Sequence, residues 1–263
     1  AFTGSNSLNR LEINNAAGLN VKTNVDINNL LSFVNGRIWV GDANSLNVQN
    51  STEASISGAS STNYVDGTLG KQIVAGQSFT FPVGDAARYG AVSVVGTTTS
   101  GISLWQAKYF NVDAASAGYN TSNYDASLQF VSKSEYWSVK SSLAGTAKVT
   151  VRWDSNSGVG NTVADYDDLR QANWNSTLWT ANGGALAGEK TGTYVAGTVT
   201  SNLVLNFGAA TSNFITIGHI TLPTSISWTG ATSTDWNVAS NWSSTVVPSS
   251  SKNVVIPTDP LSG

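Results

Sequence analysis

Hydrophobic and polar residues alternate in short runs along most of this chain, and clusters of glycine, asparagine, serine and threonine separate the runs. Near the middle of the chain, for example, Val149, Val151 and Trp153 alternate with polar residues. A period of two is typical of β-strands that bury one face. Helical periodicity is nearly absent, and only residues 165–174 suggest either a helical turn or a loop. The pattern therefore predicts an all-β protein.

The first part of the chain has a longer regularity, because pairs of apolar residues return after about 18 to 19 positions. The pairs are Leu11/Ile13, Leu19/Val21, Val25/Ile27, Leu30/Leu31, Ile38/Val40 and Leu46/Val48. Asparagine tolerates left-handed corners, and it lies between the pairs at Asn14, Asn15, Asn28, Asn29, Asn35, Asn44, Asn47 and Asn50. We interpret residues 1–63 as two to three coils of a parallel β-solenoid, with an antiparallel meander as the alternative.

From residue 64 onward the apolar runs are separated by turn-rich connections of uneven length. About nine strand-like runs cover residues 64–71, 78–84, 91–95, 104–111, 136–140, 148–154, 172–179, 193–200 and 214–221. Many short strands with such turns predict an antiparallel β-sandwich over residues 64–224. We expect the short solenoid to pack against this sandwich, and residues 225–263 to form a strand segment that caps it or opens a further module.

Composition narrows the classes of function. Charged residues make up 11% of the chain and the formal net charge is -3, so we expect no basic surface for a nucleic acid. The apolar stretches are far shorter than the roughly 20 residues of a membrane-spanning helix, so we expect no membrane insertion. The chain has no Cys and no Met, which excludes disulfides and thiol chemistry and suits an extracellular or cell-surface protein exposed to oxidants.

The acidic run near residue 166 is the best candidate for a metal site. Asp165, Asp167 and Asp168 lie close together, and Asp154 precedes them. Closely spaced carboxylates and loop carbonyls are the oxygen ligands that Ca²⁺ requires. The alternative is a solvated loop in which an aspartate caps a short helix. We therefore expect no obligatory cofactor and keep calcium as a hypothesis that rests on these aspartates.

Two groups of tryptophans suggest further sites: Trp105, Trp174 and Trp179 in the expected sandwich, and Trp228, Trp236 and Trp242 in the terminal segment. The first group would form a sugar-stacking platform if its side chains emerged on one face, although aromatic residues at strand spacing usually pack in a core. The second group has a spacing that suits side chains folded over the open end of a solenoid. Direct contact with a sugar is its alternative.

Signatures of catalysis are weak. The single histidine, His219, lies in an alternating apolar strand, which favours a structural position. One histidine leaves little for a Ser/His/Asp arrangement, and no G-x-S-x-G motif is present. A glycosidase needs two carboxylates on either side of a cleft, and the sequence singles out no such pair. We therefore expect no enzymatic activity.

Several motifs occur in a fixed order: YVDG at Tyr64, FPVGDAARYG at Phe81, EYW at Glu135, VTVRWD at Val149 and DLRQANWNSTLW at Asp168. Together they resemble a module of large secreted cell-surface proteins of Bacteroidota, such as gliding-motility-type adhesins and other cargo of type IX secretion. The later segment WTGATSTDWNVASNW, with VP and VVIP after it, is similar to the part that opens the next repeat in such chains. The resemblance covers residues 64–257 and implies an extracellular multi-domain adhesin or stalk, without catalytic residues.

These observations lead to one main hypothesis and two alternatives. We expect a non-catalytic structural or adhesive module of an extracellular multi-domain surface adhesin. Its partners would be neighbouring modules of the same chain, because the terminal segment starts a new unit close to the last residue. One alternative is a carbohydrate-binding, lectin-like module that grips surface glycans. The other is a self-assembling filament subunit, in which residues 251–263 add a strand to the next copy.

Overall fold

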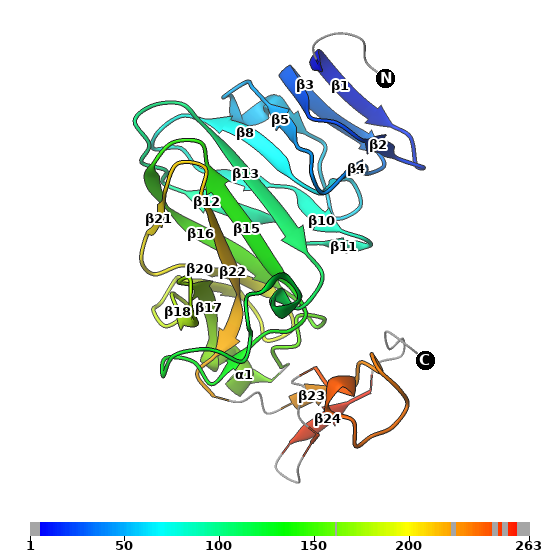
Figure 1. The fold of residues 1–263 in the computed structure, drawn as a ribbon, viewed down its shortest axis with the longest axis vertical. Helices are drawn as coiled ribbons and strands as arrows, with labels where there is room; N and C mark the ends of the chain where they lie inside the picture. The colour runs from blue at the N-terminus through cyan, green and yellow to red at the C-terminus, as the bar shows by residue number, and fades with distance from the viewer. Residues whose placement is uncertain (1–5, 161, 222–224, 244–246, 249–251, 257–263) are drawn as a thin grey trace. The chain divides into compact units, whose positions relative to one another are not determined.

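The fold is nearly all β, as the alternating pattern predicted, in a computed structural model of the chain (Figure 1). The structure describes residues 6–160, 162–221, 225–243, 247–248 and 252–256. The chain divides into two compact units. Unit 1 consists of Ala1–Asn111, Trp137–Val151 and Val204–Phe214, and unit 2 consists of Val112–Tyr136, Arg152–Leu203 and Ile215–Gly263.

Unit 1 contains a parallel β-solenoid of about four turns, which confirms the predicted solenoid and exceeds the expected two to three coils. Its first sheet, blue to cyan in Figure 1, is formed by β1 (Ser7–Asn14), β3 (Val25–Asn35), β5 (Leu46–Val48) and β8 (Leu69–Ile73), with β6 (Ile56–Ser57) beside β3. Its second sheet is formed by β2 (Leu19–Val21), β4 (Ile38–Val40), β7 (Val65–Asp66), β10 (Val83–Asp85) and the antiparallel β11 (Arg88–Tyr89).

The apolar pairs of the sequence form the interior of the coils. Ile27, Leu31 and Leu46 have no exposed surface. The repeat is less even than the sequence suggested. Leu8 pairs with Ile27 on the next coil, whereas Ile38 pairs with Val65, which lies further along the chain than one regular interval. The third coil is longer because it includes β6 and the short 3-10 turn η1 (Glu53–Ser55).

Amide side chains hydrogen-bond from one coil to the next. Asn50 Nδ2 donates to Asn29 Oδ1 at 3.2 Å, and Asn47 Nδ2 donates to Asp26 Oδ1 at 3.0 Å. Each pair joins equivalent positions on successive turns, so the polar residues stack in register with the apolar ones. A hydrogen bond between neutral groups, such as that of Asn50 with Asn29, contributes about 1 kcal/mol net, and the geometry of both pairs favours a single register of the coils.

Unit 1 also contains antiparallel strands that continue directly from the solenoid. Strand β8 pairs with β13 (Ser103–Phe110), and β15 (Tyr136–Ser141) lies next to β13. A second sheet contains β9 (Phe79–Phe81), β12 (Val92–Val95), β16 (Gly145–Trp153) and β21 (Leu205–Phe207). Between the sheets Trp105 packs edge-to-face on Phe207, with 4.8 Å between ring centroids. A solenoid joined to a sandwich is the predicted fold class.

Unit 2 is built from short antiparallel pairs. Its strands are β14 (Phe130–Val131), β17 (Leu169–Trp174), β18 (Trp179–Ala181), β19 (Lys190–Gly192), β20 (Gly197–Thr200) and most of β22 (Ser212–His219). Strand β17 pairs with β18 and β22, and β19 pairs with β20. The unit also holds the 3-10 turn η2 (Ala114–Ala117) and α1 (Val163–Asp168), the single α-helix of the described residues. No helix in the described part of the chain has the length and apolar character to cross a membrane.

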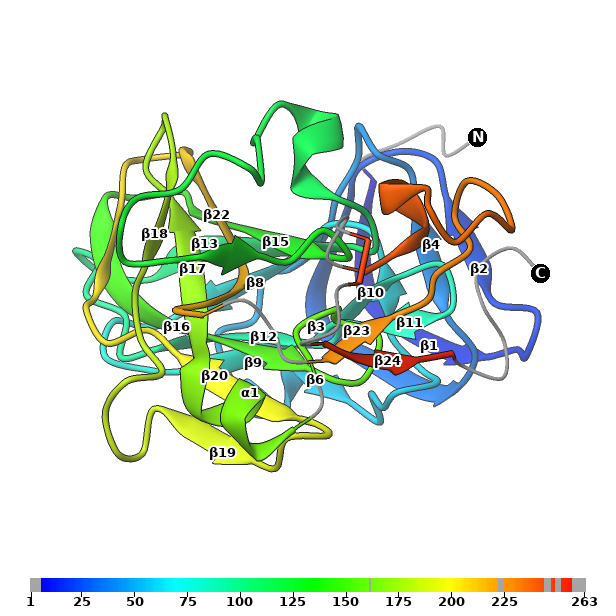
Figure 2. The ribbon, with the colours of Figure 1, turned by 90° about the horizontal axis from the view of Figure 1, so that it is seen from below.

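The terminal segment of unit 2 contains a small parallel pair, β23 (Ser225–Ser227) and β24 (Asn253–Val255), which lie side by side in Figures 1 and 2. The 3-10 turn η3 (Ala239–Asn241) lies between them in sequence. Asn241 organises this segment, because its Oδ1 accepts the N–H groups of Thr232 and Ser233, both at 2.8 Å. Of the segment expected to add a strand to another copy, 251–263, the structure describes only residues 252–256, and β24 pairs within its own chain.

Candidate functional site

Three aspartates lie at the carboxyl ends of successive parallel strands in the second solenoid sheet. Asp66 ends β7, Asp85 ends β10, and Asp42 follows the last residue of β4 closely. The strand register pairs Asp66 with Gly84, the neighbour of Asp85. Parallel strands bring their carboxyl ends to one edge of a sheet, where ligand sites often form. The stacking of the coils thus gathers carboxylates that are far apart in sequence.

These aspartates border a cleft of about 590 Å³ in unit 1. Its other wall includes Gln106, Lys108, Phe110, Ser138, Lys140 and Ser212. The volume lies within the roughly 300–1,000 Å³ of typical small-ligand sites. Unlike most such sites, the cleft has walls dominated by charged and hydrogen-bonding side chains. Its chemistry therefore favours a polar ligand.

The opposite wall depends on the alternation of side chains along β13. Trp105 and Tyr109 have no exposed surface and belong to the core. The side chains that alternate with them along β13 point to the other face, where Gln106, Lys108 and Phe110 are half-buried and border the cleft. Buried and half-buried side chains alternate along β15 as well, and the half-buried ones also border the cleft. The strand pattern that builds the core of unit 1 therefore also builds the site.

Two polar contacts join the wall to the solenoid. Gln106 Nε2 donates to Asn47 Oδ1 at 2.9 Å, and Lys108 Nζ lies 2.7 Å from Asp42 Oδ1. The hydrogen bond and charge of Lys108 lower the pKa of the Asp42 carboxyl group. Asp42 is almost fully exposed, with 98% of its side-chain surface accessible, so this ion pair adds little stability. Its main effect is to hold Lys108 at the rim and to neutralise its charge.

Asp66 lies in a different environment. Burial and, to a lesser degree, the nearby Asp85 carboxylate raise its pKa to about 6. Three smaller effects lower this pKa: a hydrogen bond from the backbone N–H of Ala86 and the positive charges of Arg37 and Lys108. Desolvation and a like charge together disfavour the ionised form. A carboxyl group of this kind in a cleft is a common feature of functional sites.

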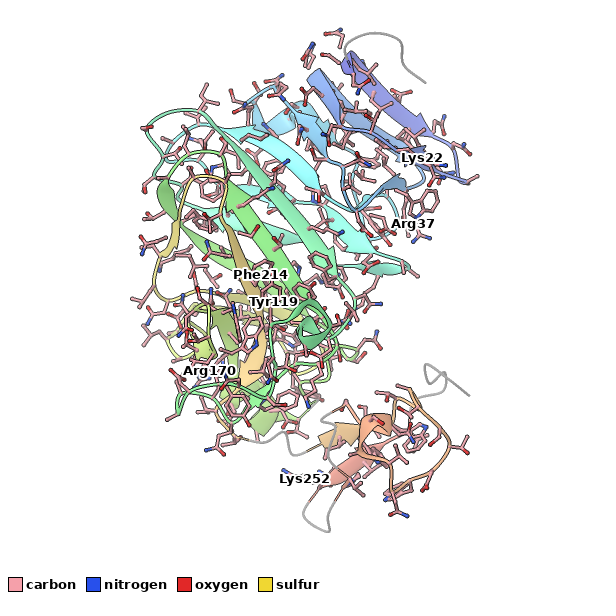
Figure 3. The ribbon with its side chains drawn as sticks, viewed as in Figure 1. Lys22, Arg37, Tyr119, Arg170, Phe214 and Lys252 are labelled. Atoms are coloured by element: carbon pink, nitrogen blue, oxygen red, sulfur yellow. The ribbon has the colours of Figure 1, made fainter. Side chains whose placement is uncertain are left out.

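The floor beside Asp85 is fixed by a hydrogen-bonded turn. Ala86 has a left-handed backbone with φ of 54°, a conformation that costs a residue other than glycine about 1 kcal/mol. Its carbonyl oxygen accepts hydrogen bonds from Tyr64 OH at 3.0 Å and from Arg37, which is labelled in Figure 3. Asp85 Oδ2 accepts the N–H of Asn111 at 2.9 Å. The motifs YVDG and FPVGDAARYG thus meet in space at this turn.

The residues proposed as calcium ligands are Asp154, Asp165, Asp167 and Asp168, and the side chains of three of them form other hydrogen bonds. Asp165 forms a capping box with Thr162 at the start of α1, the role given above as the alternative. Asp168 accepts the hydroxyl group of Thr221. Asp154 closes a turn by accepting the N–H two residues later at 2.9 Å. Among the residues that the structure describes, no group of three or more His, Asp or Glu side chains could hold a metal ion.

The tryptophans proposed as a sugar platform are mainly core residues. Trp105 and Trp179 have no exposed surface, so neither offers a face to a ligand. Trp174 is half-buried, and its ring lies 5.4 Å from that of Trp179 within unit 2. The apolar strand spacing that made these residues conspicuous is the reason that they lie inside. The general tendency of aromatic residues to pack in cores applies here.

The tryptophans proposed as a cap, Trp228, Trp236 and Trp242, form one aromatic cluster. The ring of Trp242 lies 4.8 Å from that of Trp228 and 4.4 Å from that of Trp236. Its Nε1 donates to the carbonyl oxygen of Trp236 at 2.8 Å. Trp242 is buried and forms the centre of the cluster, whereas Trp236 is 46% exposed. Capping of a solenoid by these residues stays a prediction.

His219 is fully buried near the end of β22, as its apolar strand indicated. Its ring contacts Phe130 with 6.1 Å between centroids. Burial lowers the pKa of His219 to about 4, and this effect exceeds the opposing influence of Asp165 and Asp168. A neutral, inaccessible imidazole offers no reactive group at the surface. Its position is structural.

The cleft residues were not among the sites predicted from sequence. Asp66 and Asp85 each lie in a recognised motif, and the interval between them matches the predicted coil interval. That interval is the signal that could have found the pair, because residues one coil apart stack on one side of a solenoid. The coils were predicted only to residue 63, so the interval was not extended to these aspartates.

Comparisons with known proteins provide no relative. Neither a protein-family model, a curated protein nor a solved structure matches this chain. Two features of unit 1 bear on its function: the continuous stack of coils and the polar cleft at its second sheet.

Proposed function

We propose that this chain is a non-catalytic structural and adhesive module of an extracellular, multi-domain surface adhesin. The observation that carries the proposal is the hydrogen-bonded path through unit 1. The solenoid strands pair in parallel from β1 to β8, and β8 then pairs with the antiparallel β13. Because one strand belongs to both parts, a pulling force passes through backbone hydrogen bonds and not through a flexible linker. This property suits a stalk that holds a contact surface away from a cell.

The chemistry of the chain supports the same proposal. Charged residues make up 11% of the sequence, and the coils are joined by neutral amide pairs such as Asn50 with Asn29. With no Cys and no Met, the chain has neither a disulfide to reduce nor a thioether to oxidise. These features favour persistence outside the cell. The resemblance of its motifs to Bacteroidota surface adhesins supports neighbouring modules as its partners.

Single-molecule force spectroscopy tests the structural part. The chain would be placed in a polyprotein between reference domains of known mechanical strength, one a β-sandwich and one a helical bundle. We expect unit 1 to unfold at forces close to those of the β-sandwich reference. Unfolding at the low forces of the helical reference would contradict a mechanical role.

A matched pair of variants links the force to the coil stack. Leu46 has no exposed surface, whereas 55% of the Val34 surface is exposed on β3. Leu46→Ala removes a core side chain and is expected to destabilise the fold by about 2–5 kcal/mol, which lowers the unfolding force. Val34→Ala is expected to leave the force unchanged. Equal forces for both variants would show that the stack does not carry the load.

The absence of catalysis has a separate test. The purified chain would be incubated with a panel of polysaccharides, and the release of reducing ends or unsaturated products would be measured over time. We expect no turnover above the level of a heat-denatured sample. Sustained turnover that disappears in Asp66→Asn would contradict the non-catalytic function and would make the cleft an active site.

A further inference from the structure

We propose that the cleft bordered by Asp66 and Asp85 binds a neutral, hydroxyl-rich oligosaccharide and is the adhesive contact of unit 1. This inference rests on the proposed adhesive function, because an adhesin needs a surface that recognises a ligand. Trp105 and Trp179, two of the three tryptophans of the predicted sugar platform, have no exposed surface. The cleft is instead a polar hollow of about 590 Å³, a volume within the range of ligand sites.

The hydrogen-bonding groups of the cleft match those of a sugar. The carboxylates of Asp66 and Asp85 accept hydrogen bonds, the ammonium group of Lys140 donates them, and Gln106 and Ser138 do both. Each hydroxyl group of a sugar also donates and accepts. Neighbouring hydroxyl groups of a sugar can therefore form hydrogen bonds with both the donors and the acceptors on the cleft wall. An apolar ligand would leave these groups without partners, which is costly.

The charges of the cleft favour a neutral ligand. Asp42 neutralises Lys108 at a distance of 2.7 Å. The lining also holds Asp66, Asp85 and Lys140, so its aspartates outnumber its lysines by one, with Arg37 acting on Asp66 from outside the lining. A uronic acid, a sialic acid or a phosphorylated sugar would meet this excess, and like charges at an interface disfavour binding. A neutral oligosaccharide avoids that repulsion.

Several of the polar groups are held in place before any ligand binds. Asp85 Oδ2 accepts the N–H of Asn111 at 2.9 Å, and Gln106 Nε2 donates to Asn47 Oδ1 at 2.9 Å. Both side chains therefore have little rotational freedom to lose. Preorganisation of this kind raises affinity because less conformational entropy is lost on binding. It also explains why the wall residues lie on strands and not on long loops.

Packing and folding stability alone do not favour an aspartate at position 66. Its carboxylate lies near that of Asp85 in a half-buried position, and it accepts the N–H of Ala86. Asparagine would accept the same hydrogen bond without a charge. A charge kept where it opposes folding is a feature of binding and catalytic sites, in which function and stability conflict. The presence of a carboxylate at this position therefore supports a role toward a ligand.

A glycan array followed by titration calorimetry tests the proposal. The whole chain would be applied to an array of neutral, acidic and amine-bearing oligosaccharides, and one neutral ligand would be titrated. We expect binding to neutral structures, and a loss of affinity of about tenfold or more for Asp66→Asn and for Asp85→Asn. Glu12→Gln is the matched control, because Glu12 is an exposed carboxylate on β1 outside the cleft. It is expected to bind as the unmodified chain does.

Three outcomes would overturn the inference. They are absence of binding to every neutral glycan, stronger binding to acidic than to neutral glycans, and unchanged affinity in both aspartate variants. Circular dichroism would verify the fold of each variant, and Lys140→Gln provides a further cleft variant if Asp85→Asn does not fold. If the array shows no glycan binding but unit 1 unfolds at high force, only the inference about the cleft is overturned. Low unfolding forces would contradict the proposed structural function, whatever the array shows.

Discussion

At the level of single residues, Asp66 connects stability with the proposed recognition. Its folded-state pKa is about 6, above its ordinary value of 3.8. Between these two values the folded state binds more protons than the unfolded state. The stabilisation associated with this proton is complete below pH 3.8 and is lost as pH rises through about 6. At neutral pH the ionised side chain therefore opposes folding.

We predict that Asp66→Asn stabilises the fold at neutral pH. The gain in the free energy of unfolding should be about 1–2 kcal/mol, a value reduced from the full pKa shift because the side chain is partly exposed. Below pH 3.8 the variant and the unmodified chain should be equally stable. Urea denaturation at both pH values measures this difference, with Glu12→Gln as the control. A loss of stability at neutral pH would show that the carboxylate has a structural role.

His219 predicts acid sensitivity. Its pKa is about 4 in the folded state and 6.5 in its ordinary state, so the unfolded chain binds a proton more readily between these values. Stability is therefore retained above pH 6.5 and is lost as pH falls toward 4, by about 3 kcal/mol in total. His219→Phe should remove this loss, because phenylalanine fits an apolar site and does not titrate.

Thermal unfolding of the unmodified chain and His219→Phe across this pH range measures the effect. Asp66 acts in the opposite direction over much of the same range, so the informative quantity is the difference between the two proteins at each pH. The difference should grow in favour of His219→Phe as pH falls. A difference that does not change with pH would mean that the imidazole is solvated or paired in both states.

At the level of elements, the β10–β11 hairpin depends on the absence of a side chain at Gly84. A Cβ atom there would overlap the ring of Tyr64 and the carbonyl oxygen of Arg88. Gly84→Ala should move the tyrosine away from Ala86 and lower the free energy of unfolding by about 1–3 kcal/mol. The expected readouts are a lower urea midpoint and a change in the near-ultraviolet circular dichroism of tyrosine.

Gly41→Ala is the control for this prediction. Gly41 lies at a corner of the solenoid, and its Cβ would approach only the flexible side chain of Asn44 closely, at 3.1 Å. We expect a change in stability of less than about 0.5 kcal/mol. If both variants were equally destabilised, a general effect of alanine at glycine positions would explain the result, and the specific overlap with Tyr64 would not.

The strands could be predicted from sequence because burial alternates locally. Val149 and Val151 are buried on β16 as their spacing indicated, and the apolar pairs of the first coils form their interior. The cleft could not be predicted in the same way. It depends on the register between coils, which follows the regular interval from Asp66 to Asp85 but not across the long third coil, where Val65, the partner of Ile38, lies beyond that interval. The sequence instead predicted a metal site at neighbouring carboxylates such as Asp165, and local helix capping and hydrogen bonds explain why these residues occur there.

At the level of the whole molecule, neutral hydrogen bonds replace most of the ionic interactions of an ordinary soluble protein. Charged residues make up 11% of the chain, compared with about 25% in typical domains. The coil contacts of Asn50 with Asn29 are uncharged, and the ion pair of Lys108 with Asp42 lies at the surface. Folding stability therefore depends mainly on apolar burial and amide hydrogen bonds, which salt screens weakly.

We predict that the free energy of unfolding changes by less than about 1 kcal/mol when sodium chloride is raised from about 0.1 M to about 1 M. Urea denaturation at neutral pH measures this change. Asp42→Asn removes the surface ion pair and should reduce even this small dependence. A large decrease in stability with salt would show that ionic interactions hold the fold together. The observed surface would then be unsuited to the variable ionic conditions outside a cell, and the extracellular role would lose its physical basis.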